Sequence, residues 1–252
     1  MHLQKSFALV IPLLITSFTA IEYSTPKPLN SSFQISNTPP SAPETPLPPG
    51  KRVPGGTRNP LGSCQQTNPP ITALMPENSQ GKTISEHPIF WFYIPYTSEE
   101  ITSAEFSLND ENENNIYRIS FKVSQKPGII SIPSPPEPKY FLKPDQYYHW
   151  YLEIKCKSNQ NSTSDLIVNQ SSKPDIVLEG WVQRITLNPS SEPNFITPEL
   201  WYDFLNQVAQ RRLNSPSNSI LNNEWTALLK SVGLEQIAPE PLRGSAESMQ
   251  VK

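Results

Sequence analysis

The fold of this chain is decided by one apolar stretch, His87-Pro88-Ile89-Phe90-Trp91-Phe92-Tyr93-Ile94-Pro95-Tyr96. β-Branched and aromatic residues fill the space between its two prolines, and this composition favours a strand over a helix. Successive side chains of a strand point to opposite faces, and here both sets are apolar. We therefore expect protein to cover both faces of this strand.

Further short strands are expected on either side of it. Several of them alternate apolar and polar side chains, which is typical of a strand with one buried and one wet face. In the last of them, Gly180 suggests a bulge. The expected strands are residues 71–76, 104–109, 117–123, 130–132, 146–156 and 176–187. Short strands at this spacing, without a helix between them, predict an immunoglobulin- or fibronectin-like β-sandwich over residues 61–190, although an open barrel or a jelly roll would show a similar spacing.

The pattern becomes helical after residue 187. Thr197 and Pro198 form a helix start, Gly233 forms a stop, and apolar side chains including Trp201 and Trp225 recur at helical spacing. We expect a C-terminal helical hairpin over residues 195–238. It either packs on the sandwich, where it covers Tyr147, Tyr151 and one side of the central apolar stretch, or stands off as an appendage for a partner. Residues 239–252 are expected to be a disordered tail.

The N-terminus has the layout of a secretory signal peptide, with one lysine before an apolar run that ends near residue 18. The run is short for a membrane span and contains Pro12; a permanent anchor is the alternative. We expect a signal peptide over residues 1–20 and a proline-rich disordered linker over residues 21–60. The mature protein is then extracytoplasmic, in the periplasm or secreted, and is not an integral membrane protein.

Cys64 and Cys156 are the two cysteines of the chain. An even number in an oxidising compartment predicts a disulfide; two free thiols are the alternative. Two cysteines without a nearby histidine pair make no zinc site. The net charge of -3 and the pI of about 5.7 disfavour nucleic acid as a partner.

Residues for catalysis are scarce in this sequence. It has no serine-hydrolase elbow, zinc-protease motif, calcium loop or phosphate loop, so we expect no catalytic residue, metal or cofactor. The candidate ligand surface is an exposed aromatic and polar stripe on two late strands, formed by Tyr147, His149, Tyr151 and Trp181. One alternative is an envelope hydrolase that uses His87 or His149 with a nearby carboxylate. Another is a purely structural spacer.

Several ordered segments resemble one protein family, the cyanobacterial domain of unknown function 928. The resemblance covers residues 55–242 and is carried by residues 62–64, 72–77, 85–96, 148–151, 179–184 and 229–234. It implies an exported cyanobacterial protein and implies neither an activity nor catalytic residues. Residues and resemblance together predict an exported, non-enzymatic binding or cell-envelope interaction module, whose partner is a protein or an envelope component.

Overall fold

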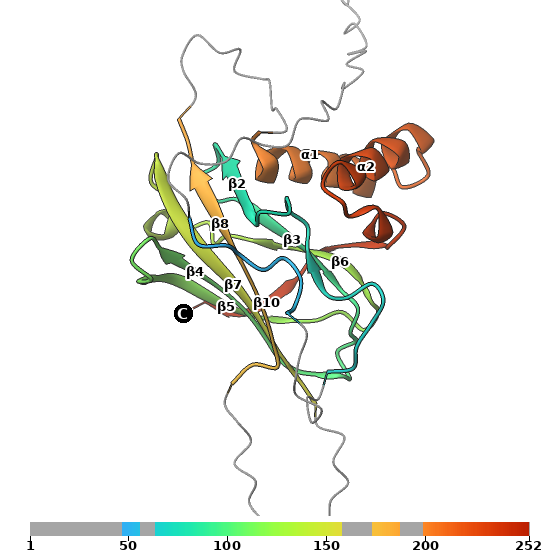
Figure 1. The fold of residues 1–252 in the computed structure, drawn as a ribbon, viewed down its shortest axis with the longest axis horizontal. Helices are drawn as coiled ribbons and strands as arrows, with labels where there is room; N and C mark the ends of the chain where they lie inside the picture. Colours follow the sequence, from blue (N-terminus) through green and yellow to red (C-terminus); the bar gives the residue numbers. More distant parts are fainter. Residues whose placement is uncertain (1–46, 56–63, 158–172, 187–198, 252) are drawn as a thin grey trace, which may run out of the picture. The chain divides into compact units, whose positions relative to one another are not determined.

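The computed structural model describes residues 47–55, 64–157, 173–186 and 199–251. In this part of the chain, ten strands form two sheets that pack face to face, and two helices lie between β8 and β9 in the sequence (Figure 1). The prediction of a mainly-β sandwich with a C-terminal helical hairpin is confirmed. Both sheets are mixed, because β2 runs parallel to β8 and β9 runs parallel to β6.

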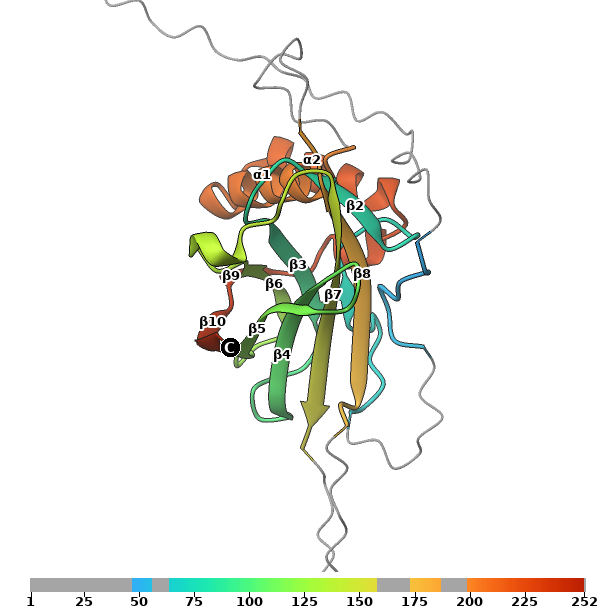
Figure 2. The same cartoon turned by 90° about the vertical axis from the view of Figure 1, so that its left-hand side faces the viewer.

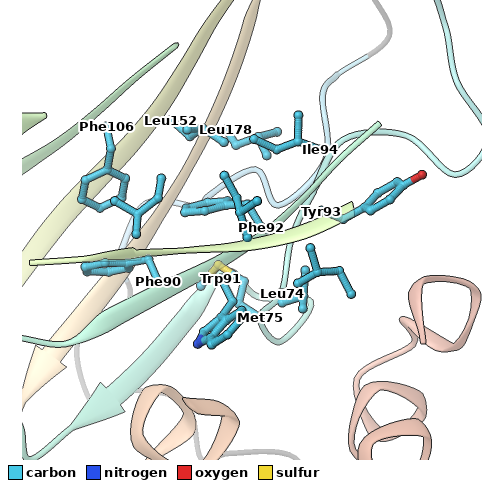
Figure 3. Packing of buried hydrophobic residues seen from close by; sticks show 14 of the residues in the cluster. Leu74, Met75, Phe90, Trp91, Phe92, Tyr93, Ile94, Phe106, Leu152 and Leu178 are labelled. Atoms are coloured by element: carbon cyan, nitrogen blue, oxygen red, sulfur yellow. The ribbon is translucent and has the colours of Figure 1, made fainter. Parts of the chain in front are cut away.

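The smaller sheet has the order β1-β3-β6-β9, and β3 lies inside it. Phe90 of β3 packs on Phe106 of the other sheet, with ring centroids 4.7 Å apart. On the opposite face of β3, Trp91 lies with Leu74 and Met75 on the side of the helices (Figure 3). Both faces of this strand are buried, which follows from its two apolar sets of side chains. The strands are β1 (Thr72–Ala73), β3 (Ile89–Ile94), β6 (Gly128–Pro133) and β9 (Leu242–Ser245).

The larger sheet has the order β10-β5-β4-β7-β8-β2. In its strand β7, Trp150 and Leu152 are fully buried against the smaller sheet, whereas Tyr147 and Tyr151 on the outer face are only half-buried. This alternation makes the inner face the core and leaves the outer face polar. The strands are β2 (Gln80–Thr83), β4 (Ile101–Asp110), β5 (Asn115–Lys122), β7 (Gln146–Cys156), β8 (Ile176–Arg184) and β10 (Glu247–Val251).

The helical hairpin consists of α1 (Trp201–Asn214) and α2 (Ser219–Ser231), with single 3₁₀ turns at Pro138–Tyr140 and Glu235–Ile237. Asn218 caps α2, because its side chain accepts hydrogen bonds from the first backbone N–H groups. Gly233, with φ of 70°, follows the end of α2 as expected for a C-terminal glycine. The predicted helix start at Thr197 and Pro198 lies outside the described residues.

The hairpin packs on the smaller sheet and on the edge strand β2 of the larger sheet, and not on the outer face of the larger sheet (Figure 2). Helix α1 contacts β2, β3 and β9, and the indole N–H of Trp201 donates to the carbonyl of Leu74 at 2.9 Å. The expectation that the hairpin packs on the sandwich and covers one side of the central apolar strand is confirmed, whereas the expectation that it also covers Tyr147 and Tyr151 is wrong. The second face of β3 is wholly apolar, so covering it removes more apolar surface from water than covering a mixed face would.

Two glycines of the larger sheet leave room for aromatic rings. A Cβ on Gly180 would lie 2.5 Å from the Trp150 ring, and a Cβ on Gly81 would lie 2.8 Å from the Tyr202 ring. Gly180 pairs in regular register with Trp150, so the predicted bulge is absent from β8. Gly81 lies within β2. These close approaches let the Tyr202 hydroxyl accept from the Trp150 indole at 2.8 Å and donate to the Trp181 carbonyl at 3.0 Å.

Both predicted disordered ends are partly ordered. Residues 47–55, which we call the strap, run beside β8 as the blue segment in Figures 1 and 2. Residues 242–251, expected in a tail, instead form β9 and β10, which pair with β6 and β5. In each case the segment forms hydrogen bonds with backbone groups at the edge of a sheet. The local composition of these segments does not predict such pairing. The predicted signal peptide and the remainder of the linker lie outside the described residues.

Candidate functional site

The four predicted surface residues lie together on the outer face of the larger sheet. Tyr147, His149 and Tyr151 alternate along β7, and Trp181 of β8 stands directly opposite His149. The rings of His149 and Trp181 stack with centroids 4.0 Å apart and planes 9° apart. However, His149 is only 7% exposed and Trp181 only 5%. The prediction of an exposed stripe is therefore wrong for these two residues.

The strap runs across this part of the sheet. The indole N–H of Trp181 donates to the carbonyl of Pro48 at 3.1 Å. Lys51 and Glu179 exchange two backbone hydrogen bonds, of 2.8 and 3.0 Å, and their side chains form an ion pair at 2.9 Å. The strap is thus paired to β8 through backbone, indole and charge.

Arg52 anchors the other end of the strap to the body of the protein. Its carbonyl accepts from the N–H of Ala73, and its guanidinium donates to the carbonyls of Met75 at 3.1 Å and Val232 at 2.6 Å. Val232 is the C-cap of α2, where carbonyl groups lack partners within the helix. Burial lowers the pKa of Arg52, and the nearby charge of Glu77 opposes this shift.

Next to the Trp181 ring lies a hydrogen-bonded cluster on the same face, formed by Glu113, His149 and Tyr151. His149 Nδ1 is 2.6 Å from Glu113 Oε1, and the Tyr151 hydroxyl lies 2.8 Å from Nδ1 and 3.1 Å from Glu113 Oε2. The other ring nitrogen, Nε2, is buried without a hydrogen-bond partner, and Glu179 Oε2 lies 3.9 Å away. A distance of 3.9 Å is too long for a hydrogen bond.

The turn between β4 and β5 places Glu113 in the cluster. Asp110 Oδ1 accepts from the backbone N–H groups of Asn112 and Asn114, each at 2.9 Å, and Glu113 adopts a φ of 63°. The side-chain and backbone N–H groups of Asn114, with a smaller contribution from Asn112, lower the pKa of Asp110. This Asx-type turn directs the Glu113 carboxylate toward β7.

Burial, hydrogen bonds and charge together shift the pKa values of Glu113 and Tyr151. Partial burial tends to raise the pKa of Glu113, but hydrogen bonds from His149, Asn109 and Tyr151 and the charge of His149 outweigh it and lower the pKa. Burial, followed by the charge and hydrogen bond of Glu113, raises the pKa of Tyr151. The cluster therefore favours an ionised Glu113 beside a neutral Tyr151.

This geometry does not resemble an open hydrolytic site. His87 lies in the turn before β3, is exposed and stacks on Phe141 with centroids 5.0 Å apart, while the neighbouring Glu86 pairs with Arg184 at 3.0 Å. The two histidines are not brought together. No group of three or more His, Cys, Asp or Glu side chains within the described ranges could hold a metal ion.

A separate groove of about 540 Å³ opens beside β10. Its floor includes Ile101, Phe121 and Ile130, and its rim includes Arg243 and Met249. None of the four predicted surface residues lines it.

Sequence reasoning missed four residues of the outer face: Pro48, Lys51, Glu113 and Glu179. Two lie in a segment that reads as linker, and one in a turn that reads as solvated. Glu179 alternates with the apolar residues of β8 and could have been placed on the outer face from that pattern. The register that sets His149 opposite both Asn109 and Trp181 has no local sequence signal.

The predicted disulfide between Cys64 and Cys156 is present, with Cα atoms 5.2 Å apart. Within the described ranges, no helix combines the length and the apolar character needed to cross a membrane. No curated protein and no solved structure matches the chain. A family model does match over residues 53–242, which is most of the chain and includes β1 to β8 and both helices. The chain therefore belongs to the family described as Domain of Unknown Function (DUF928).

Proposed function

We propose that this protein is an exported, non-enzymatic binding module of the cell envelope and that its contact surface is the outer face of the larger sheet. The observation that carries the proposal is the Trp181–His149 stack, which is buried although neither the second sheet nor the hairpin covers it. The strap meets the Trp181 indole there, because the carbonyl of Pro48 accepts the indole N–H at 3.1 Å. Tryptophan and tyrosine are enriched where proteins bind other chains.

Export is supported by two independent features. The N-terminal residues have the layout of a signal peptide, and the Cys64–Cys156 disulfide is of the kind that persists in oxidising compartments. The envelope assignment and the cyanobacterial origin extend the family resemblance and are part of the proposal.

The non-enzymatic assignment is supported by the state of His149. A general base must come within hydrogen-bond reach of its substrate. Nδ1 of His149 is held by Glu113 and Tyr151, and Nε2 is buried beneath the outer surface. An envelope hydrolase at this position would require the strap to leave and Nε2 to become accessible.

Co-sedimentation of the purified full chain with isolated envelope membranes tests the proposal. Tyr147→Ala and Tyr151→Ala alter half-buried residues of the outer face. We expect the variant that carries both changes to lose affinity by a factor of about ten or more, as for an aromatic hot spot. Ile220→Ala is the matched control, because Ile220 is 73% exposed on α2, away from this face.

Three outcomes are distinct. Weaker binding by the tyrosine variant alone supports the proposed surface. Equal binding by all proteins places the contact elsewhere. No sedimentation of the unmodified protein contradicts the binding module and favours the structural spacer, in which case an unrelated sandwich should replace residues 64–242 without a phenotype.

A further inference from the structure

We infer that the outer face is a recognition site for an extended proline-rich peptide of the pattern Pro-Pro-Gly-Lys, and that the strap is this ligand bound in cis. The inference rests on the outer face being the binding surface proposed above, and it names the chemistry of the ligand. Four consecutive strap residues carry it: Pro48, Pro49, Gly50 and Lys51.

The backbone of the strap presents its carbonyls in the form that proline-rich recognition uses. Leu47 and Pro48 each precede a proline, so both are held in the extended or polyproline region. A polyproline segment has no internal hydrogen bonds, which leaves its carbonyls free to accept from a receptor. The receptor donor here is the Trp181 indole N–H, 3.1 Å from the carbonyl of Pro48.

The donor is held rigidly by the aromatic side chains around it. Trp181 stacks flat on His149, and His149 in turn contacts Tyr151 with ring centroids 4.3 Å apart. Glu113 holds the imidazole through Nδ1. Aromatic-lined surfaces with a fixed donor are the usual receptors for preformed polyproline segments.

Gly50 and Lys51, the two residues after the prolines, determine which peptide residues the site accepts. A Cβ on Gly50 would lie 2.5 Å from Ser79 Cβ and 2.7 Å from the carbonyl oxygen of Glu179, so only glycine fits there. Lys51 forms an antiparallel bridge with Glu179 and an ion pair with its carboxylate. The site thus specifies a glycine and then a cation after the proline pair.

The same chain contains a natural counterexample. Pro39 and Pro40 form another proline pair, but Ser41 and Ala42 follow it in place of glycine and lysine. This segment lacks the small residue and the cation that the site requires. It should not bind, and it provides a peptide of the same origin that differs in the recognised positions.

The family match includes the residues of the receptor surface but not the ligand segment of the strap. Trp181, Glu179 and His149 lie within the family match over residues 53–242, whereas Pro48 to Lys51 lie before it. The receptor surface therefore belongs to the family domain and the ligand segment does not. A receptor surface inside the family domain and a ligand segment outside it fit a ligand that can be supplied either by the same chain or by a second chain.

Fluorescence anisotropy with a labelled peptide of residues 45–53 tests the inference. A tethered ligand acts at an effective concentration on the order of mM, so the unmodified chain should bind the added peptide weakly. In the full chain carrying Pro49→Ala and Lys51→Glu, which weaken the strap, we expect binding to be about tenfold tighter or more.

Matched changes identify the contacts. Trp181→Phe in the strap-weakened chain keeps a ring but removes the donor, and should weaken binding about tenfold, as loss of a hot-spot hydrogen bond does. The Gly50→Ala peptide and the peptide of residues 36–44 should not bind. Failure of the strap-weakened, folded chain to bind the 45–53 peptide overturns the inference.

A second measurement decides the matter if the strap-weakened chain does not fold. In the unmodified chain, a 45–53 peptide that carries a nitroxide spin label should broaden the Trp181 indole N–H resonance when it is added above the effective concentration, on the order of 10 mM. An unchanged resonance overturns the inference. If envelope binding still depends on Tyr147 and Tyr151 while the peptide does not bind, the proposed function stands and only the peptide chemistry is wrong.

Discussion

Tyr202 ties the helical hairpin into the interior of the sandwich. Its buried hydroxyl accepts from the Trp150 indole and donates to the Trp181 carbonyl, and burial raises its pKa well above the usual range. Tyr202→Phe keeps the ring but leaves both partners without this hydrogen bond. We expect the free energy of unfolding to fall by about 1–3 kcal/mol, because each buried polar group left unpaired is costly.

Urea unfolding followed by circular dichroism measures this change. Tyr140→Phe is the control, since Tyr140 is half-buried and its ring contacts the exposed side chain of Lys139. The control should change stability by less than about 0.5 kcal/mol. A loss for Tyr202→Phe no larger than that of the control would contradict the role assigned to the hydroxyl.

Glu113 makes the outer face sensitive to acid. Its pKa is lowered in the folded protein, because the hydrogen bonds and charge of its neighbours outweigh partial burial. A carboxyl of this kind stabilises the fold above its unfolded pKa of about 4.3, and the contribution is lost as the pH falls through the lower folded value. We expect Glu113→Gln to lower the urea midpoint at pH 7, and to lower it by progressively less as the pH falls below about 4.3.

Urea midpoints measured from pH 7 down to pH 3 test this expectation. Glu111→Gln is the control, since Glu111 is exposed at the tip of the same turn. A Glu113→Gln effect that stayed constant over the whole pH range would show that its ionisation is not the cause.

The strap is the element that covers the outer face, and its position depends on Gly50. A Cβ at this position would meet Ser79 and the backbone of Glu179, neither of which is the end of a flexible side chain. We expect Gly50→Ala to cost about 1–3 kcal/mol, as overpacking does, and to expose the strap to proteolysis. Limited trypsin digestion at Lys51 and Arg52, together with urea unfolding, measures both effects.

Gly55→Ala is the matched control for the strap. No atom lies within 4 Å of a Cβ at Gly55, so this change should leave digestion and stability unaltered. Equal resistance of the two variants to trypsin would mean that the strap does not depend on the close approach at Gly50.

At the scale of the whole molecule, the disulfide joins the segment before β1 to the end of β7. Cys64 and Cys156 are separated by 92 residues. In the chain-entropy model a loop of this length stabilises the folded state by about 4–5 kcal/mol. We expect Cys64→Ser with Cys156→Ser to lower the free energy of unfolding by up to about this amount.

Urea unfolding with and without reductant measures the contribution of the disulfide. Reductant should destabilise the unmodified chain to the level of the double serine variant and should leave that variant unchanged. A loss below about 1 kcal/mol would mean that other contacts hold the two segments together in the unfolded or the folded state.

Strands whose side-chain pattern is self-contained could be predicted from the sequence. β3 has two apolar sets and β7 has one, and the predicted range of β7, residues 146–156, coincides with the observed strand. β2 could not be predicted, because Gln80-Gly81-Lys82-Thr83 has no apolar alternation and becomes a strand only by pairing with the edge of β8. β9 and β10 likewise depend on the edges of β6 and β5.

Only part of the candidate site could be predicted from the sequence. Alternation along β7 placed Tyr147, His149 and Tyr151 on one face, because the side-chain period of a strand is two. Burial of His149 and Trp181 could not be foreseen, since Pro48, which meets the Trp181 indole, is 133 residues away in the sequence and lies in a segment with the composition of a linker. The Glu113 carboxylate joins the face only through a left-handed turn conformation and the register of β4 with β7.

The sequence by itself determined the two-faced central strand, the mainly-β class, the helical hairpin, the cysteine pair and the family. Each of these depends on local side-chain pattern, composition or ordered segments. The side-chain pattern also predicted that the hairpin covers one face of β3. Tertiary structure alone decided that the strap lies on Trp181 and that Glu113 meets His149. These contacts join distant parts of the chain, and their free energy depends on which surfaces meet in the folded protein, which no single stretch of residues encodes.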